Sequence, residues 1–403
     1  MICGIAVRFG RITMLNIKTY NKISPIGLDE FDKTAYTCGD DVEQPVGAIV
    51  RSAALHDVEF PKSLLAIARA GAGTNNIPVD RCANEGIVVF NTPGANANAV
   101  KELVIAGLLI GSRRVIPAIN WALTLKGKGD EVGKMVEKGK GAFVGPEIKG
   151  KSIGVIGLGA IGVLVANAAN SLGMKVYGYD PYLSVNSAWN LTHNAIHAMD
   201  LKDIYEKCDY ITVHVPLTPE TKGFINSESI AMMKDGVRIL NFARGDLVDS
   251  ADMLAALDGG KVAAYVTDFP SDELIGADGV VCIPHLGAST PESEDNCAKM
   301  AAEELIDYIE NGNITNSVNM PNISMPKSGD ARICVIHKNV PAVINKISGV
   351  ISEANINISN MLNKSRKDFA YTMLDMDEKD SGKIEAIRKA IDEMPEVIRV
   401  RVI

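Results

Sequence analysis

The 403-residue sequence lacks the features that define several classes of protein. No run of about 18 apolar residues occurs, so no helix is expected to span a membrane. Basic residues are not in excess: 41 Lys and Arg stand against 49 Asp and Glu, a net charge of −8, which argues against a nucleic-acid-binding protein. The seven cysteines are widely spaced, the nearest pair being Cys282 and Cys297. This spacing predicts neither a metal site nor a disulfide framework, and favours reduced core thiols in a cytoplasmic protein.

The residues that are present indicate a folded chain of two to three domains. From about 150 to 286, apolar strand patterns alternate with helical ones, and residues 14–95 show a weaker alternation of the same kind. Both patterns predict α/β domains with doubly wound, Rossmann-like parallel sheets. We expect residues 1–13 to be an extension that precedes the first domain.

The C-terminal region has a different pattern. Residues 319–330 are rich in Pro, Asn, Ser and Gly, which is typical of a linker. Residues 331–403 then follow the order βαββαβ, with strand alternation at Arg332–His337, Tyr371–Met376 and Val397–Val402. This order predicts a third, ferredoxin-like unit.

A glycine-rich turn indicates a dinucleotide site. Gly157, Gly159 and Gly162 follow the apolar strand Ile153–Ile156 and precede a helical run. Glycines at this spacing permit a tight turn, let backbone amides approach a pyrophosphate and let the helix pack on the sheet. The helix N-terminus then offers unpaired N–H groups to the phosphate.

An acidic residue selects the cofactor. Asp180 lies 18 residues after Gly162, at the end of the next predicted strand. A carboxylate there accepts hydrogen bonds from the ribose hydroxyls of NAD and repels the extra phosphate of NADP. No Arg follows within five residues. The sequence therefore predicts NAD as the cofactor.

Three further residues point to hydride-transfer chemistry. Arg244, Glu273 and His285 each come after a predicted strand, so all three belong to the edge of the sheet where such folds bind ligands. A neutral His accepts a hydroxyl proton near pH 7, a carboxylate can orient its ring, and Arg grips a carboxylate with two donors.

At these residues a family resemblance emerges. Residues 14–325 resemble the D-isomer-specific 2-hydroxyacid dehydrogenases, with the glycine loop, His214-Val215-Pro216-Leu217, Phe242-Ala243-Arg244-Gly245, Asp268 and the His285 segment in family order. The resemblance implies that Arg244 binds the substrate carboxylate and carbonyl, that Glu273 supports His285 and that His285 moves the proton.

The resemblance also implies a cofactor site and a domain plan. Asp268 is expected near the nicotinamide carboxamide, and the rest of the NAD cleft comprises Gly157, Gly159, Ala160, Ile161, Gly162, Asp180, His214, Val215, Pro216, Phe242, Ala243, Arg244, His285 and Gly287. The substrate-binding domain is expected to be split into residues 14–96 and 287–318. The NAD-binding Rossmann domain is expected to occupy residues 97–286.

The third unit, 331–403, resembles an ACT domain, a regulatory module that binds amino acids. A family member with such a domain resembles the enzymes that oxidise 3-phospho-D-glycerate to 3-phosphooxypyruvate in phosphorylated L-serine biosynthesis. The resemblance implies that His337, Asn339 and Asn357 bind L-serine between the ACT domains of two subunits of a homodimer or homotetramer. One residue departs from the pattern, since Ala342 stands where the family commonly has Gly. An ACT domain that only pairs subunits is the alternative.

The substrate contacts follow from the same comparison. Arg51 and Ser52 match the family's substrate-binding segment, and the loop with Ala72 and Gly73 offers backbone amides to a carboxylate. Lys140 lies where a relative places a phosphate-contacting lysine, with a solvated basic loop as the alternative.

Two other functions remain open at this point. A reductase of glyoxylate, hydroxypyruvate or another 2-oxo acid would keep the same catalytic residues, but the ACT unit argues against it. A non-enzymatic NAD-sensing protein of the same fold would need no ACT domain, and a dehydrogenase assay would exclude it.

Overall fold

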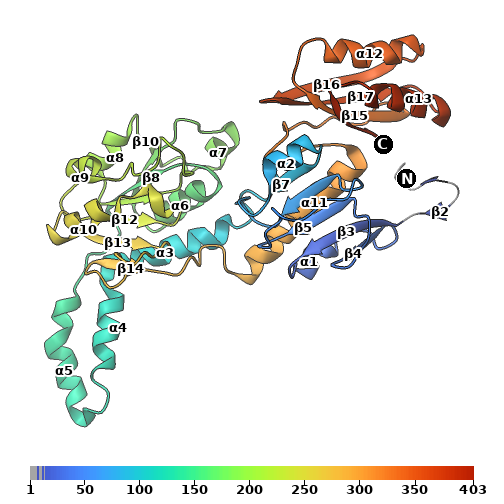
Figure 1. Ribbon diagram of the computed structural model, residues 1–403. Coiled ribbons are helices and arrows are strands. Elements are labelled where there is room, and N and C mark those ends of the chain that lie inside the picture. The colour runs from blue at the N-terminus through green and yellow to red at the C-terminus, as the bar shows by residue number, and fades with distance from the viewer. Residues whose placement is uncertain (1–6, 9–10, 13) are drawn as a thin grey trace. The chain divides into compact units, whose positions relative to one another are not determined.

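The computed structural model describes residues 7–8, 11–12 and 14–403 (Figure 1). The chain divides into two compact units, one formed by Met1–Asn96 with Glu294–Ile403 and the other by Ala97–Ser293. The expected extension at residues 1–13 falls largely outside the described residues; what is described of it is an antiparallel pair, β1 (Val7–Arg8) and β2 (Arg11–Ile12). Among the described residues, no helix has the length and apolar character needed to cross a membrane.

The first unit contains a five-stranded parallel sheet in the order β4-β3-β5-β6-β7. Helices α1, α2 and α11 accompany it. Their bounds are β3 Leu15–Tyr20, α1 Pro25–Leu28, β4 Tyr36–Gly39, β5 Gly47–Val50, β6 Ala66–Arg69, α2 Val79–Asn84, β7 Val88–Asn91 and α11 Pro291–Asn311. Every residue of β5 is buried, as expected for a parallel strand covered on both faces. Close packing of α1 on α11 requires Gly27, because a Cβ there would come within 2.4 Å of the Ala298 backbone.

The second unit contains a seven-stranded parallel sheet in the order β10-β9-β8-β11-β12-β13-β14. Its strands are β8 Ser152–Ile156, β9 Lys175–Tyr179, β10 Ile196–His197, β11 Tyr210–Val213, β12 Val237–Asn241, β13 Val262–Thr267 and β14 Val280–Cys282. Its helices around the sheet are α3 Ala97–Arg113, α6 Ala160–Ser171, α7 Val185–Asn190, α8 Leu201–Lys207, α9 Ser227–Met232, η3 Gly245–Leu247 and α10 Ser250–Asp258. The strand order reverses between β8 and β11, which places a ligand-binding crevice at the carboxyl ends of these strands.

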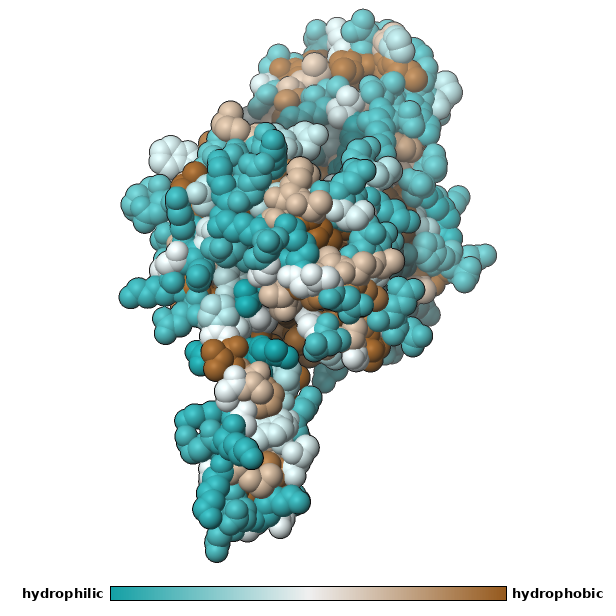
Figure 2. Space-filling model, turned by 90° about the vertical axis from the view of Figure 1, so that its left-hand side faces the viewer, coloured by the Kyte–Doolittle hydropathy of each residue, from teal (hydrophilic) through white to brown (hydrophobic). Residues whose placement is uncertain are grey.

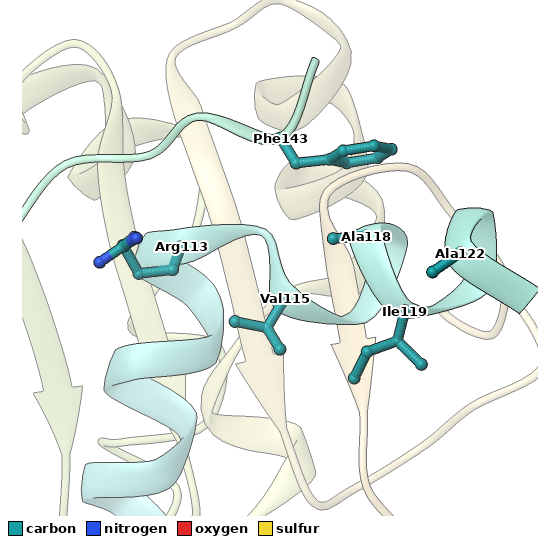
Figure 3. A pocket seen from close by; sticks show the side chains of 6 residues that line it. All are labelled: Arg113, Val115, Ala118, Ile119, Ala122 and Phe143. Carbon is teal, nitrogen blue, oxygen red and sulfur yellow. The ribbon is translucent and has the colours of Figure 1, made fainter. Parts of the chain in front are cut away.

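A helical arm extends from the second unit (Figure 1). It consists of α4 Val115–Leu123, η1 Gly129–Glu131, α5 Val132–Gly139 and η2 Lys140–Phe143. None of the residues of α4 is buried, and Leu123 is 70% exposed. Val115, Ile119 and Phe143 are among the residues that line a hollow of about 590 Å³ beside α4 (Figure 3). Figure 2 shows apolar residues among the hydrophilic ones of this arm. No pattern in the sequence indicated this arm.

The C-terminal part of the first unit is a four-stranded antiparallel sheet in the order β16-β17-β15-β18. Its elements are β15 Ala331–Lys338, α12 Val343–Glu353, β16 Ile358–Arg366, β17 Phe369–Met376, α13 Ser381–Asp392 and β18 Val397–Val402. Ile347 of α12 and Ile387 of α13 share a buried core with Ile333 of β15, so both helices pack on the sheet. The predicted βαββαβ order and the two Rossmann-like sheets are confirmed.

The C-terminal sheet is joined to the five-stranded lobe by arginines. Arg401 donates to the carbonyl of Tyr308 (2.7 Å), and Arg399 donates to that of Leu64 (2.6 Å). The fully buried Arg332 pairs with Asp375 through Nε at 2.6 Å and Nη2 at 2.8 Å. Its Nη1 also donates to the carbonyl of Asn311, at the end of α11 (2.8 Å).

The segment 319–330 is packed in this structure. Met320, Ile323 and Met325 are buried in the core that the five-stranded lobe shares with the C-terminal sheet. Ile323 forms an isolated antiparallel bridge with Ile314. The composition of this segment predicted a linker. The segment packs against the protein instead of lying free, because its three apolar side chains are buried.

Candidate active site

The glycine loop connects β8 to α6. Gly157 has φ +91°, and a Cβ there would lie 2.6 Å from the carbonyl oxygen of His214. A Cβ on Gly162 would lie 1.9 Å from the carbonyl oxygen of Gly157, so only glycine lets α6 approach the turn. A Cβ on Gly159 would meet no atom within 4 Å, and no side chain caps α6. With Ala160 and Ile161 at the start of the helix, the loop leaves its backbone N–H groups available to a phosphate.

Asp180 lies directly after β9 and faces this loop. Its Oδ2 accepts the N–H of Leu158 at 2.9 Å, and its Oδ1 accepts the N–H of Tyr182 at 2.8 Å. Because a carboxylate has about four acceptor positions, both oxygens can also accept ribose hydroxyls. The predicted glycine loop and the predicted acid are thus brought together.

His214, Val215 and Pro216 follow β11, beside the glycine loop. The Nε2 of His214 is 2.9 Å from the hydroxyl of Thr212. Among the described residues, its buried Nδ1 has no hydrogen-bond partner. Burial lowers the pKa of His214 to about 4, so the ring is neutral at physiological pH.

Asp268 is the most deeply buried acid of the site, with 1% of its surface exposed. Its Oδ2 accepts the N–H of Gly287 at 3.2 Å, while Oδ1 has no partner among the described residues. Burial raises the pKa of Asp268, although the N–H of Gly287 and the nearby His285 and Arg244 oppose the rise. A buried carboxyl with one unpaired oxygen matches the amide hydrogens of a nicotinamide carboxamide. The residues present therefore fit NAD.

Arg244 and His285 lie at the same sheet edge as Asp268. Arg244 follows the buried Phe242 and the half-buried Ala243, and its exposed guanidinium donates to the carbonyl of Ala243 (2.6 Å). His285 adopts a left-handed backbone with φ +40°. Its N–H donates to the carbonyl of Asp268 at 2.9 Å, and its ring lies 4.8 Å from that of Phe269. A left-handed conformation at a non-glycine residue is uncommon and occurs often in active sites.

Glu273 is placed differently from the other two expected catalytic residues. It is exposed, in a turn that follows β13. Within the described part of the chain it forms no hydrogen bond or ion pair, with His285 or with any other residue. Support of His285 by Glu273 therefore stays a prediction.

The expected substrate residues of the first unit follow β5 and β6, at the carboxyl ends of these strands. Arg51 forms an ion pair with Glu294 at 2.7 Å, and the N–H of Ser52 donates to Asn21 at 3.1 Å. The carbonyl of Ala72, beside Gly73, accepts a 2.6 Å hydrogen bond from the side chain of Asn91.

Lys140 belongs to the second unit, where it begins η2 of the helical arm. Its ammonium group pairs with Glu137, one turn earlier in the arm. Its proposed contact with the substrate phosphate stays a prediction.

The expected effector residues differ in exposure. His337 is 2% exposed, and its ring nitrogens lie 2.8 Å from the Lys338 carbonyl and 2.9 Å from the Thr372 hydroxyl. Asn339 and Asn357 are exposed, and their amides donate to the Lys367 carbonyl and to Asp377. Ala342 directly precedes α12 as its N-cap residue and has φ +69°, a left-handed backbone that glycine adopts more easily.

Sequence reasoning missed several residues that shape the site. Phe269 supports the ring of His285, Thr212 orients His214, and Asn91 holds the Ala72 loop. A signal existed for Phe269, which follows Asp268 directly, but nothing in the sequence indicated which ring it meets. Among the described residues, no cluster of three or more His, Cys, Asp or Glu side chains could hold a metal ion.

Comparison with known proteins defines the family. The profile for the NAD binding domain of D-isomer specific 2-hydroxyacid dehydrogenases matches residues 119–287, and an ACT domain profile matches residues 327–401. D-3-phosphoglycerate dehydrogenase of Haemophilus influenzae is 33% identical over 358 residues, which cover 86% of this chain and 83% of that one. The chain belongs to the D-isomer-specific 2-hydroxyacid dehydrogenase family. As a family member it is an NAD-dependent dehydrogenase.

Other members of this dehydrogenase family extend the comparison. D-3-phosphoglycerate dehydrogenase of Bacillus subtilis is 35% identical over 297 residues, which cover 72% of this chain and 53% of that one. The chain thus spans about half the length of that relative. The NAD+-bound crystal structure of 3-phosphoglycerate dehydrogenase from Entamoeba histolytica superposes with a TM-score of 0.60 at 27% identity, over 76% of this chain and 99% of that one.

Proposed function

We propose that this dehydrogenase oxidises 3-phospho-D-glycerate to 3-phosphooxypyruvate with NAD, the first step of phosphorylated L-serine biosynthesis. The observation that carries the proposal is the convergence of Arg244, Asp268 and His285 at one sheet edge, in a chain whose relatives are named D-3-phosphoglycerate dehydrogenases. The ACT domain favours this substrate over glyoxylate and other 2-oxo acids, whose reduction would leave that domain without a role.

The catalytic roles follow from the chemistry of each side chain. Bound NAD supplies the acceptor for the hydride that leaves C2 of the substrate. His285 takes the proton of the C2 hydroxyl, so that the C–H and O–H bonds are exchanged for the carbonyl. Arg244 binds the substrate carboxylate and carbonyl with its planar guanidinium. Glu273 stabilises His285 once it is protonated.

The remaining contacts are assigned by the same proposal. Asp268 and the glycine loop bind NAD, while Arg51, Ser52, Ala72 and Gly73 bind the substrate and Lys140 its phosphate. The substrate-binding domain comprises residues 14–96 and 287–318, the NAD domain comprises residues 97–286, and residues 331–403 form the regulatory domain.

The ACT domain supports regulation by an amino acid. We infer that L-serine is the effector and that it binds at His337, Asn339 and Asn357. The site is completed by the same residues of a second subunit in a homodimer or homotetramer. The enzyme would work in the cytoplasm, where its thiols stay reduced.

One assay tests the function. NADH formation from 3-phospho-D-glycerate and NAD is measured with and without L-serine, together with the reverse reduction of phosphooxypyruvate. Activity that L-serine suppresses supports both assignments. Activity that L-serine leaves unchanged supports the enzyme and points to an ACT domain that only pairs subunits. Failure in both directions, with active reduction of glyoxylate or hydroxypyruvate, would replace the proposed substrate.

A further inference from the structure

A buried glutamate is linked through two asparagines to the loop proposed to bind the substrate. Glu304 is in α11 and has only 8% of its surface exposed. Its Oε1 accepts a hydrogen bond from the Asn316 side-chain amide at 2.8 Å. Its Oε2 is buried and has no partner among the described residues. One neutral donor does not compensate a buried negative charge, so this environment favours the protonated carboxyl.

The charges around Glu304 do not change this balance. The neighbouring Glu303 is exposed and disfavours a second negative charge. Lys299, on the same helix, pairs with Glu30 and Glu303. Arg366 of β16 approaches the adjoining segment, but there it donates to the carbonyl of Ser317 at 2.7 Å. Burial, the largest effect, raises the pKa of Glu304 to about 8.

A continuous chain of hydrogen bonds connects Glu304 to the loop. Asn316, which Glu304 holds, has a left-handed backbone with φ +59°. The carbonyl of Asn316 accepts the N–H of Asn91 at 3.3 Å. The side chain of Asn91 in turn donates to the carbonyl of Ala72 at 2.6 Å. The position of the Ala72–Gly73 loop therefore depends on the segment that Glu304 anchors.

We propose that Glu304 is a positioning residue that holds the Ala72–Gly73 loop in its substrate-binding conformation only while its carboxyl is protonated. Burial disfavours the ionised carboxylate more than its hydrogen bond from Asn316 favours it. Ionisation therefore draws the carboxylate toward water together with the segment it anchors, and loosens the contact between Asn91 and Ala72. The inference rests on the proposed substrate role of Ala72 and Gly73, and it makes substrate affinity, but not NAD affinity, fall at alkaline pH.

The experiment compares the full-length wild type with Glu304→Gln, which keeps the shape of the neutral carboxyl. KM for 3-phospho-D-glycerate and KM for NAD are measured between pH 7 and 9.5. The ratio of wild-type to variant KM for the substrate should rise about 30-fold over this range, because the protonated fraction of a carboxyl with a pKa of about 8 falls by that factor between pH 7 and 9.5. The same ratio for NAD should stay constant. Taking the ratio cancels the pH dependence of the chemical step. Glu303→Gln, the exposed neighbour, is the matched control and should behave as the wild type.

Equal substrate KM profiles for the wild type and Glu304→Gln would overturn the inference. Should Glu304→Gln fail to fold, Asn316→Gly serves as a second variant, because glycine accepts the left-handed backbone. Loss of the amide should then give a raised substrate KM with no alkaline rise, and an unchanged alkaline rise would contradict the proposal.

Failure of the proposed function gives a different pattern. An enzyme inactive on 3-phospho-D-glycerate but active on hydroxypyruvate has another substrate, and the same KM comparison with hydroxypyruvate then tests Glu304.

Thermal unfolding provides a readout that needs no turnover. Because the pKa of Glu304 is higher in the folded chain, the wild type should lose Tm relative to Glu304→Gln as pH rises from 5 to 8. Coincident Tm profiles would also overturn the inference.

Discussion

The N–H of His285 donates to the carbonyl of Asp268 across 2.9 Å, and the carboxylate of Asp268 accepts the N–H of Gly287. These two hydrogen bonds tie the segment after β14 to the end of β13. They hold His285 at φ +40°, so the ring of the proposed base is aimed by its backbone as well as by Phe269. Among the described residues, the other carboxyl oxygen of Asp268 has no partner. Under the proposed function, one acid therefore supports both the base and the nicotinamide.

Replacing the imidazole should separate chemistry from cofactor binding. We expect His285→Asn to lower kcat for 3-phospho-D-glycerate by about 10²–10⁴-fold, because no group remains to take the hydroxyl proton. Asparagine tolerates the left-handed backbone, so the segment should keep its conformation. Fluorescence titration should give an NAD dissociation constant close to that of the wild type. The exposed His197→Asn is the control, and near-normal turnover of His285→Asn would remove His285 from the role of base.

The buried ion pair between Arg332 and Asp375 should contribute strongly to stability. Both side chains are fully buried, so Arg332→Met leaves an uncompensated carboxylate and should cost about 3–5 kcal/mol in the free energy of unfolding. The double variant Arg332→Met/Asp375→Leu should recover most of that loss. Urea unfolding at pH 7 measures both, and a double variant no more stable than the single one would contradict this account.

The same pair predicts a loss of stability in acid. Burial raises the pKa of Asp375, but hydrogen bonds from Arg332 and Ser328 outweigh it, and the net shift is downward. A carboxyl with a lowered folded pKa stabilises the fold above its unfolded pKa of about 3.9 and loses that contribution as pH falls below it. The difference in unfolding free energy between the wild type and the double variant should therefore shrink from pH 5 to pH 3.

Ala342 carries a removable backbone strain. Its φ of +69° at the start of α12 places a Cβ in the left-handed region, which costs about 1–2 kcal/mol. Ala342→Gly should raise the unfolding free energy by about 0.5–1 kcal/mol after the greater freedom of glycine in the unfolded chain is subtracted. Ala354→Gly, at a right-handed position that ends α12, should lower it instead. Thermal unfolding of the two variants should shift Tm in opposite directions.

Much of the fold could be predicted because its strands are marked by apolar runs with turn residues at both ends. Two examples are Lys175–Tyr179 and Val262–Thr267, which are strands within the alternating pattern predicted for residues 150–286. Strand β16 was predicted only as a member of the βαββαβ order, and its length was not indicated. It continues through Asn363, Lys364 and Ser365 to Arg366 as a polar edge strand. The helical arm was not predicted, because its residues contact each other and solvent rather than the sheet, and none of the residues of α4 is buried.

The candidate site was predictable where a residue's place follows from its strand. Asp180 and Asp268 each follow a strand directly, so strand topology alone brings them to the sheet edge. Contacts between loops depend on exact backbone paths, which explains why the support of His285 by Phe269 was not expected. The hydrogen bonds that link Glu304 to Ala72 join segments more than 200 positions apart in the sequence. No local sequence pattern indicates such a link.

The arginines of the C-terminal sheet donate mainly to backbone carbonyls of the five-stranded lobe. Carbonyls belong to every residue type, so Leu64, Glu85 and Tyr308 can drift in evolution without losing the acceptors that they offer to Arg399 and Arg401. Only the two donors, Arg399 and Arg401, must keep their residue type for these hydrogen bonds to form. A graft of this ACT domain onto another dehydrogenase would therefore have to match a backbone path rather than a set of side chains.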